Sequence, residues 1–389
     1  MLSFHESIIL SSPENFFEVR HLTLKGTNYE IGRKLGEIAK EIHSIAKEPT
    51  EDMLQTRCQS VYLEKNYPIF YERMRGIADA YNANMRKDLI DFSLLGEAIL
   101  STGCSAVYYP PSRTTLGHGI ISRNLDFYMP SSMPALSKPY IIEMYPDKGY
   151  PSISILSFQL LGESLEGINA KGLTVVHLAD DESTSRYHTE PTYCNAVGLN
   201  ELKSVQLLLD TCATVEEAKE ALLVNKHFYM FQPIHLLIAD KSGNSFVWEY
   251  SHTHNKEYII EGKDDPQIIT NFLLHRYESI KDIPRVSDEK TCPYNRYRAL
   301  YHAIKEHDRK VTLDFVKETN ALVFVEKNSY KNPPEIPVRT LLHSVYDIDN
   351  RSVEVSFYLK DNFNVEKKEY EQSIRSPYFK FSLQAKDTF

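Results

Sequence analysis

Gly103-Cys104-Ser105-Ala106-Val107-Tyr108-Tyr109 is the stretch of sequence that decides the fold. Within it, Ser105 to Tyr109 is a β-type run, and the turn residues of Pro110 to Gly119 return the chain into a second run, Ile120 to Phe127. The pattern predicts a β-hairpin that carries Cys104 at one end.

Cys104 gives the first functional hypothesis. If the peptide bond after Gly103 breaks, Cys104 becomes an N-terminal residue whose thiol lies next to its own α-amine. An α-amine has a reference pKa of about 7.7 to 8.0, so near neutral pH it can accept the thiol proton, and no histidine is required as base. Gly103 favours such a break because it offers an unhindered carbonyl and tolerates strained backbone angles. The alternative to a nucleophile is that Cys104 is a small buried hydrophobic residue, as most cysteines outside disulfides are.

Composition places the chain of 389 residues among ordinary globular proteins, with 42% hydrophobic and 25% charged residues. The formal net charge is −9 and no Lys/Arg block is dense enough to follow a phosphate backbone, which argues against nucleic acid as a partner. The start, Met1 to Glu6, lacks a secretory signal, and no apolar run is long enough to cross a bilayer. We therefore expect a cytoplasmic protein with no membrane partner. Five widely separated cysteines without a CxxC pair indicate neither a disulfide framework nor a zinc ribbon.

The chain before Gly103 reads as mostly helical. Apolar residues recur at helical spacing in three stretches: Asn28 to Lys47, Ile69 to Tyr81 and Leu89 to Ile99. A short piece around Phe17 to Leu24 is the exception, because it looks extended. We therefore expect a mostly helical, propeptide-like segment of residues 1–103 ahead of a second domain of residues 104–389.

Beyond the hairpin, β-type runs are interrupted by helices in two places. Further strands are predicted at Tyr140 to Tyr145, Ser152 to Phe158, Gly172 to Leu178, Ile234 to Ala239, Ser245 to Tyr250, Leu341 to Tyr346 and Val353 to Tyr358. Helices are predicted at Leu202 to Thr211, from Thr214 through Leu222, at Tyr297 to Ile304 and from Thr312. Such an order favours two sheets covered by helices over alternating βα units.

Arg123 and Asp126 stand at the end of an apolar strand, where charged side chains are rarely buried without a task or a partner. A plain structural ion pair is the alternative. Three residues apart on a regular strand, the two side chains point to opposite faces. We therefore expect the strand to end or bulge between them if both are to reach Cys104.

Three further polar residues are candidates for the same site. Asn271 follows the β-like Gln267 to Ile269 and offers a side-chain amide donor of the kind a tetrahedral oxyanion needs, although an Asx-turn also explains it. Arg296 and Arg298 open a helix and could bind a carboxylate or brace a site, or could simply be solvated.

The histidines do not form a convincing catalytic or metal site. His177 lies in the apolar run Val175 to Leu178, where a hydrogen-bonded core histidine is the better interpretation. His252 and His254 have a spacing that could hold a metal, but no third ligand is evident and a solvated strand end explains them. We assign no metal and no cofactor.

Several motifs occur in the order expected of N-terminal-nucleophile (Ntn) hydrolases: Gly103-Cys104-Ser105, the Ser122 to Phe127 strand, Asn169-Ala170-Lys171-Gly172-Leu173, Thr270-Asn271-Phe272 and Asn295-Arg296-Tyr297. More narrowly, the chain resembles the penicillin acyltransferase (acyl-CoA:6-aminopenicillanic acid acyltransferase) group, related to choloylglycine hydrolases and linear-amide C–N hydrolases. The resemblance covers most of the chain, since Gly26 to Gly32 and Ile238 to Gly243 also match the group's patterns.

The resemblance implies an α+β fold, a four-layer αββα sandwich of two antiparallel sheets, and a precursor that cleaves itself between Gly103 and Cys104 while keeping the helical N-terminal fragment bound. Residues 104–389 would form the catalytic domain. The implied roles are Cys104 as nucleophile, its α-amine as base, Arg123 and Asp126 orienting thiol and amine, Asn271 donating to the oxyanion, and Arg296 supporting the site with Arg298 as its rival. Ala179 stands where choloylglycine hydrolases have an asparagine, so that oxyanion contact must come from elsewhere.

We therefore expect a self-processing cysteine amidase that hydrolyses a small linear amide through an acyl-thioester on Cys104. The alternatives are an acyl-CoA-dependent N-acyltransferase on the same fold and an unprocessed, non-catalytic binding protein. The expected partner is a small-molecule amide or acyl-thioester, and the sequence leaves a homo-oligomer open.

Overall fold

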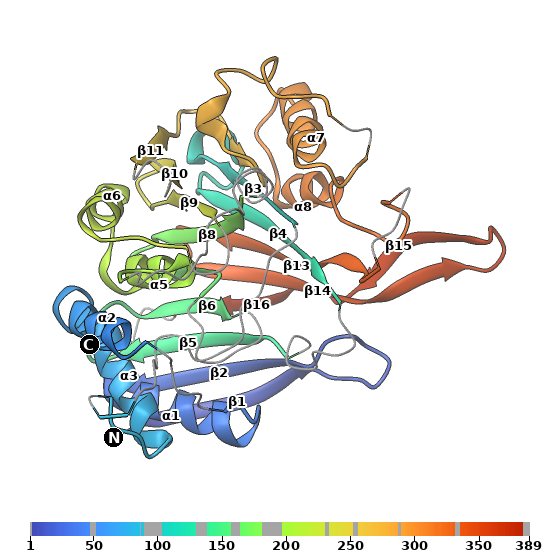
Figure 1. Cartoon of the computed structure of the whole chain (residues 1–389). Helices are drawn as coiled ribbons and strands as arrows, with labels where there is room; N and C mark the ends of the chain where they lie inside the picture. Colours follow the sequence, from blue (N-terminus) through green and yellow to red (C-terminus); the bar gives the residue numbers. More distant parts are fainter. Residues whose placement is uncertain are drawn as a thin grey trace.

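Two β-sheets pack face to face, and helices cover the outer face of each sheet (Figure 1). The computed structural model describes residues 2–46, 52–85, 87–88, 103–129, 138–156, 164–180, 197–229, 233–251, 256–286, 289–330 and 335–383. The four layers confirm the expected α+β αββα sandwich.

The larger sheet has nine strands. Their order is β1 (Ser3–Leu10), β2 (Val19–Gly26), β5 (Tyr140–Pro146), β6 (Ser152–Leu156), β7 (Glu166–Asn169), β8 (Thr174–Ala179), β9 (Ile234–Ala239), β10 (Ser245–Ser251) and β11 (Lys256–Glu261). One neighbouring pair, β2 and β5, is parallel, so the expectation of purely antiparallel sheets is wrong here. The chain passes through helices and through the other sheet between these two strands, and only a long crossover permits parallel pairing.

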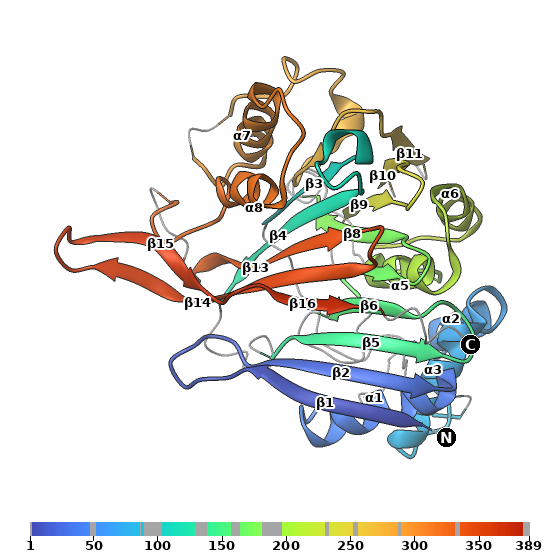
Figure 2. The same cartoon turned by 180° about the vertical axis from the view of Figure 1, so that it is seen from behind.

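The smaller sheet has seven strands and contains the predicted hairpin. Its order is β12 (Gln267–Ile269), β3 (Gly103–Tyr109), β4 (Ile120–Tyr128), β13 (Val338–Asp347), β14 (Ser352–Asn364) and β15 (Glu369–Arg375), with β16 (Phe379–Ser382) also paired to β14. The far halves of β14 and β15 project from the body as a long hairpin (Figure 2).

Helices cover both outer faces. Packed on the nine-stranded sheet are α1 (Asn28–Glu41), α2 (Met53–Asn66), α3 (Pro68–Ala80), α5 (Glu201–Thr211) and α6 (Val215–Val224). Packed on the seven-stranded sheet are α7 (Pro293–Glu306) and α8 (Leu313–Ala321). The described residues also include two short 3-10 helices, η1 (Pro111–Arg113) and η3 (Leu274–Arg276). Within the described ranges, no helix combines the length and apolar character needed to span a bilayer.

The N-terminal segment contains strands as well as helices. Its described residues form α1, α2 and α3 together with β1 and β2, and these two strands form one side of the nine-stranded sheet. The extended piece predicted around Phe17 to Leu24 corresponds to β2, but β1 has only a weak apolar alternation and was not predicted. The helical stretch predicted at Leu89 to Ile99 lies outside the described residues.

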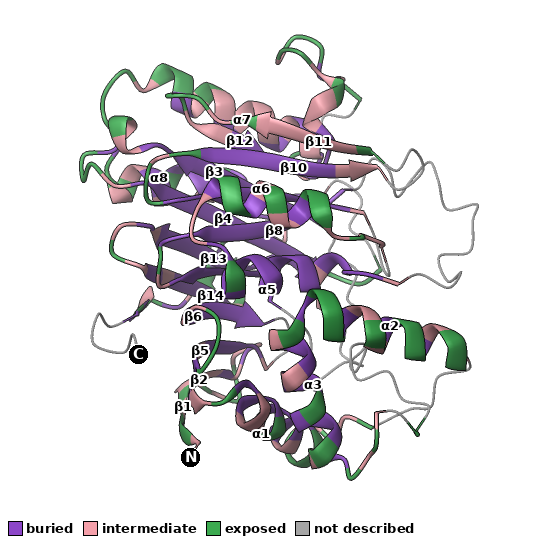
Figure 3. Ribbon diagram, turned by 90° about the vertical axis from the view of Figure 1, so that its left-hand side faces the viewer, coloured by how far each residue is buried: buried purple, intermediate pink, exposed green. Residues whose placement is uncertain are grey.

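A hydrophobic core lies between the two sheets. Cys104, Leu125, Ile153, Val176 and Leu237 belong to it, and all are at most 1% exposed. Burial is concentrated in the central strands, whereas the outward faces of α2 and α6 remain exposed (Figure 3). Gly32 permits the close packing of α1 on α3, because a Cβ there would lie 2.0 Å from the carbonyl oxygen of Arg73. Gly32, the last residue of the N-terminal motif Gly26 to Gly32, therefore has a packing function.

Candidate active site

Cys104 is the second residue of β3 and is completely buried in the continuous chain. Its side chain belongs to the core between the sheets, together with Ala106 and Tyr108, whereas Val107 and Tyr109 face the layer of α7 and α8. The two-residue period of the strand thus points the thiol toward the nine-stranded sheet.

Arg123 lies beside the thiol. It is on β4, paired with Ala106 and therefore on the same face as Cys104, and its guanidinium nitrogen is 3.4 Å from Sγ. The same nitrogen donates to the carbonyl oxygen of His177 at 3.1 Å, and Nε lies 3.2 Å from an oxygen of Glu166. Burial raises the pKa of the Glu166 carboxyl, and the charge of Arg123 opposes that rise. A fixed positive charge therefore stands next to Sγ, where it favours a thiolate.

Asp126 lies on the opposite face of β4, and the expected irregularity between it and Arg123 is absent from that strand. β4 pairs with β3 in unbroken register, and the register shift occurs instead in β13, between Thr340 and Leu342. The expectation that β4 ends or bulges is therefore wrong. Asp126 instead reaches the backbone of Cys104 indirectly, from the side covered by α7.

Asp126 and Gly103 are direct neighbours on that side. They are a cross-strand pair, and a Cβ on Gly103 would lie 3.1 Å from Oδ2 of Asp126. The carboxylate accepts a hydrogen bond from the hydroxyl of Thr340, and its Oδ2 lies 3.6 Å from Nη1 of Arg296. Burial raises the pKa of the Asp126 carboxyl, while Arg296 and the Thr340 hydrogen bond lower it.

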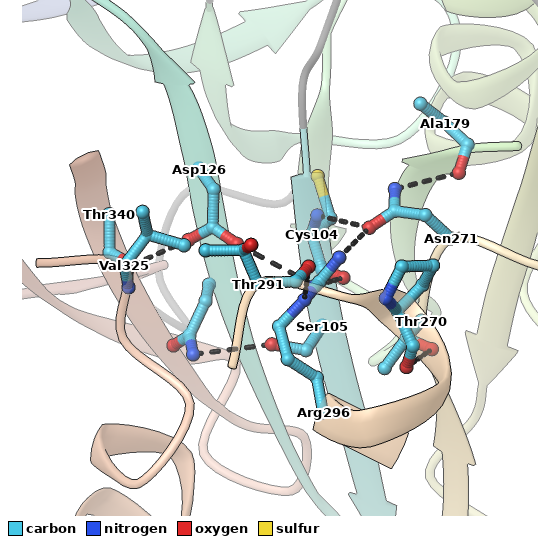
Figure 4. Close-up of polar contacts among 12 residues, drawn as sticks. Cys104, Ser105, Asp126, Ala179, Thr270, Asn271, Thr291, Arg296, Val325 and Thr340 are labelled. Carbon is cyan, nitrogen blue, oxygen red and sulfur yellow. Dashed lines mark hydrogen bonds and ion pairs between the residues drawn. The ribbon is translucent and has the colours of Figure 1, made fainter. Parts of the chain in front are cut away.

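Asn271 contacts the backbone nitrogen of Cys104 (Figure 4). Its Oδ1 accepts from that N–H at 2.6 Å and from Nη2 of Arg296 at 2.6 Å, and its Nδ2 donates to the carbonyl oxygen of Ala179 at 2.8 Å. Both partners of Oδ1 can only donate and the partner of Nδ2 can only accept, so the orientation of the amide is determined. An amide nitrogen carries two hydrogens, so Asn271 can keep its bond to Ala179 and still donate to an oxyanion.

Arg296, rather than Arg298, lies at Cys104. Its Nη1 donates to the carbonyl oxygen of Cys104, its Nη2 to Asn271, and its Nε to the carbonyl oxygen of Thr291 at 3.1 Å. The side chain is 2% exposed. Arg298 points the other way and donates to the carbonyl oxygen of Ile283. The period of α7 separates the two arginines, since residues two apart on a helix do not share a face.

Sequence reasoning missed Glu166 and Thr340. Glu166 had a usable signal, because it is a charged residue within the apolar run Leu165 to Ile168. Thr340 had no such signal, because a threonine in a strand is ordinary.

The Asn169 motif is a structural turn: Oδ1 of Asn169 accepts from the backbone of Lys171 and Leu173.

Groups that could bind metals lie apart from Cys104. His177 is buried. Burial together with the charges of Arg123 and His235 lowers the pKa of its imidazole to about 3, so the ring is neutral near neutral pH. His252 and His254 lie outside the described residues. In the described part of the chain, His118, Asp347 and Asp349 place ligand atoms within 4.8 Å of one another. They lie where β4 begins, at the opposite end of that strand from Asp126, and hydrogen bonds within the turns already engage them.

The chain is similar to known proteins in sequence and in fold. The model of a family described as "Acyl-coenzyme A:6-aminopenicillanic acid acyl-transferase" matches residues 113–362, which include Arg123, Asp126, Asn271 and Arg296, whereas Cys104 lies before them. Penicillin V acylase from Agrobacterium tumefaciens is 20% identical over 67% of this chain and 84% of that chain, with a TM-score of 0.48. A mutant of conjugated bile acid hydrolase from Clostridium perfringens is 15% identical over 71% of this chain and 96% of that chain, with a TM-score of 0.50, which indicates a shared fold. No curated protein matches the chain.

Proposed function

Because the chain belongs to the acyl-coenzyme A:6-aminopenicillanic acid acyl-transferase family of Ntn hydrolases, we propose that it is a self-processing cysteine amidase. In this proposal it hydrolyses a non-peptide linear amide bond through an acyl-thioester on Cys104. The observation that carries the proposal is the contact of 3.4 Å between the buried guanidinium of Arg123 and Sγ of Cys104, directly after Gly103. A cation held beside a thiol stabilises the thiolate, and both the self-cleavage and the hydrolysis of the amide require that thiolate as nucleophile.

Processing comes first in this proposal. Sγ of Cys104 attacks the carbonyl carbon of Gly103, the bond from that carbon to the nitrogen of Cys104 breaks, and the nitrogen takes up the proton that the thiol gave up. The product is a thioester between Gly103 and Sγ. Water then hydrolyses the thioester, which releases the carboxylate of Gly103 and regenerates the thiol beside a new α-amine. Residues 1–103 remain bound to residues 104–389 as a second chain.

Turnover uses the new α-amine as base. It takes the thiol proton, Sγ attacks the substrate carbonyl, and the amine product leaves with the proton that the α-ammonium returns. Water hydrolyses the resulting acyl-thioester to the acid. Asn271 and Arg296 already hold the nitrogen and the carbonyl oxygen of Cys104, so both help to orient the base. Asp126 balances the charge of Arg296.

Incubation of the purified, processed protein with a panel of N-acyl amides and acyl-thioesters tests the proposal. We expect release of acid and amine from at least one amide, together with a covalent acyl adduct whose peptide map places it on Cys104. A protein that stays full-length and forms no adduct with an amide-mimicking electrophile would instead be a non-catalytic binding protein of this fold.

Acyl transfer is the second candidate, because the matching family is described as an acyltransferase. Hydrolysis and transfer share the acyl-thioester and differ in whether water or an acceptor amine resolves it. Adding acceptor amines to the same assay separates them. Formation of a new amide at the expense of free acid would assign transfer.

Replacing Arg296 by methionine should slow processing about 100- to 1,000-fold, the loss typical of removing one preorganised donor at a reacting group. The change removes the donors to Cys104 and Asn271 and leaves Asp126 without its closest positive charge. Arg298→Met is the matched control, because that side chain bonds only the Ile283 carbonyl in the described region. Intact mass over time measures both variants, and equal rates would remove Arg296 from the site.

Replacing Glu166 by glutamine should lower turnover about ten- to a hundred-fold, because it removes the negative charge that pairs with the buried guanidinium of Arg123. The carboxylate is the buried partner that holds Nε of Arg123 while the other end of the guanidinium faces Sγ. Glu257→Gln is the control: this half-buried residue bonds Trp248 on the outer face of the same sheet. An unchanged rate of thiol alkylation in Glu166→Gln would contradict the role.

A further inference from the structure

A buried carboxylate, Glu249, binds the loop that follows Asn271. Glu249 lies on β10 of the nine-stranded sheet and its side chain is 0% exposed. One oxygen accepts the backbone N–H of Leu274 at 2.7 Å, and the other accepts the backbone N–H of His275 at 3.1 Å. These are the first two residues of η3, so the carboxylate caps the start of that turn.

The imidazoles of two histidines complete the environment of Glu249. Nδ1 of His275 lies 2.5 Å from Oε2, and Nδ1 of His235, on β9, lies 3.4 Å from Oε1. The ring of His275 also stacks on the ring of Tyr258, with 3.6 Å between the ring centroids. Tyr258, on β11, is the cross-strand partner of Glu249. Glu249 and Tyr258 thus form a cradle on the nine-stranded sheet that holds His275.

The loop bound in this way belongs to the other sheet. It begins at β12, which pairs with β3, and Asn271 lies two residues after Ile269. The backbone of Asn271 is therefore fixed on one side by the ladder to β3 and on the other side by the bonds of Leu274 and His275 to Glu249. Nδ2 of Asn271 reaches across the same gap to Ala179 on β8. Its Oδ1 lies 2.6 Å from the nitrogen of Cys104, so the backbone that carries this side chain is anchored on both sides of the contact.

We propose that Glu249 is a positioning residue that holds Asn271 against the nitrogen of Cys104 by tying the 271–275 loop to the nine-stranded sheet. The inference rests on the proposed function. Among the described residues, the hydrogen bonds of Glu249 go to the loop and to His235, so it acts through Asn271 and does not touch the reacting atoms.

The charge of Glu249 persists over the working pH range. Burial alone would raise the pKa of this carboxyl, but hydrogen bonds from His235 and His275 and from the backbone of Leu274 lower it to about 2. A carboxyl whose pKa is depressed on folding stabilises the native state above its unfolded pKa and loses that contribution only as the pH falls toward the folded value. The hydrogen bonds from Leu274 and His275 to the Glu249 carboxylate should therefore persist at every pH above about 4.

Glu249→Gln tests the inference, because an amide can accept from one backbone N–H but presents a donor to the other. We expect processing at Gly103–Cys104, and kcat on a substrate amide, to fall about ten- to a hundred-fold with KM changed less than about threefold. Glu143→Gln is the matched control, a partly buried glutamate on β5 whose partners are His21 and Tyr145. It should react at the wild-type rate.

The double variant Glu249→Gln/Asn271→Ala separates positioning from general destabilisation. If Glu249 acts through Asn271, the double variant should be within about twofold of Asn271→Ala alone, whereas independent effects would multiply. Multiplied effects, or a Glu249→Gln protein as fast as wild type, would overturn the inference while leaving the proposed function intact. Absence of processing and turnover in the wild-type protein would instead remove the proposed function itself.

Leu274→Pro keeps the test open if Glu249→Gln does not fold. It deletes one donor to Glu249 and leaves the carboxylate in place. The preceding Leu273 already has φ −76° and ψ 111°, which suits a residue before proline, and the first position of a helix tolerates proline. We expect processing about three- to tenfold slower than wild type. A folded Leu274→Pro protein with the wild-type rate would overturn the inference.

Discussion

Replacing Cys104 by alanine should leave the chain in one piece and should abolish amide turnover, with a loss of at least about 1,000-fold. Both reactions in our account begin with attack by Sγ, which stands beside Arg123 in the core between the sheets. Removing the sulfur removes the nucleophile while it changes the volume of the side chain little. Intact mass and an amide hydrolysis assay on the same sample measure the two losses together.

Cys212→Ala is the matched control for that experiment. Cys212 is also buried, but it lies under α5 and α6 on the outer face of the nine-stranded sheet, and burial raises the pKa of its thiol to about 11. A thiol of that kind is a poor nucleophile at neutral pH. The Cys212 variant should be processed and active. A Cys104→Ala protein that is still cleaved after Gly103, or still turns over amides, would refute the mechanism.

Replacing Asp210 by alanine should destabilise the protein by about 3 to 5 kcal/mol, the cost of leaving one partner of a buried ion pair uncompensated. Asp210, on α5, accepts two hydrogen bonds from Arg73 at 2.8 and 2.9 Å and another from Tyr67, and both charged side chains are at most 4% exposed. Arg73 and Tyr67 belong to the N-terminal segment. The pair therefore joins residues 1–103 to the rest of the chain.

The consequence of that loss depends on processing. We propose that the two fragments stay associated after cleavage. β2 of the first fragment pairs with β5 of the second over seven residues, and the ion pair of Arg73 with Asp210 also joins the two fragments. The wild-type fragments should co-elute in size-exclusion chromatography under native conditions, and those of Asp210→Ala should separate or aggregate. Glu72→Ala is the matched control, because it removes the exposed ion pair of Glu72 with Arg75 on α3, the helix that carries Arg73. It should change the free energy of unfolding by less than about 1 kcal/mol. Equal behaviour of the two variants would contradict this account.

The β-hairpin that carries Cys104 could be predicted from the sequence, because it depends on local signals. Alternation along β3 and β4 places Cys104 and Arg123 on one face, and the turn between them closes the strands in register. The location of Asn271 and Arg296 came instead from the resemblance to a family, since each lies far along the chain from Cys104 and contacts it through tertiary packing.

The position of Asp126 could not be predicted from a single strand. The period of two correctly puts it on the face opposite to Arg123, yet the inference that the strand must break was wrong. The site uses both faces of β3: the side chain of Cys104 is reached from the core, and its backbone from the layer of α7, where Arg296 links Asp126 to the carbonyl oxygen. Contacts of that kind depend on how a helix packs on a sheet, and a local pattern carries no information about them.

The N-terminal strands show the same limit. β2 alternates buried and partly exposed residues and gave a signal, whereas β1 is an edge strand with an irregular pattern that follows no clear period. No residue of β1 is fully buried, so its sequence carries no strong apolar pattern.

The mass of the purified, folded protein under denaturing conditions tests the central claim most directly. Our account predicts two species, one ending at Gly103 and the other beginning at Cys104 with an unblocked α-amine. A single species of the full-length mass, from protein whose thermal unfolding proves it folded, would contradict the claim that Cys104 acts as an N-terminal nucleophile.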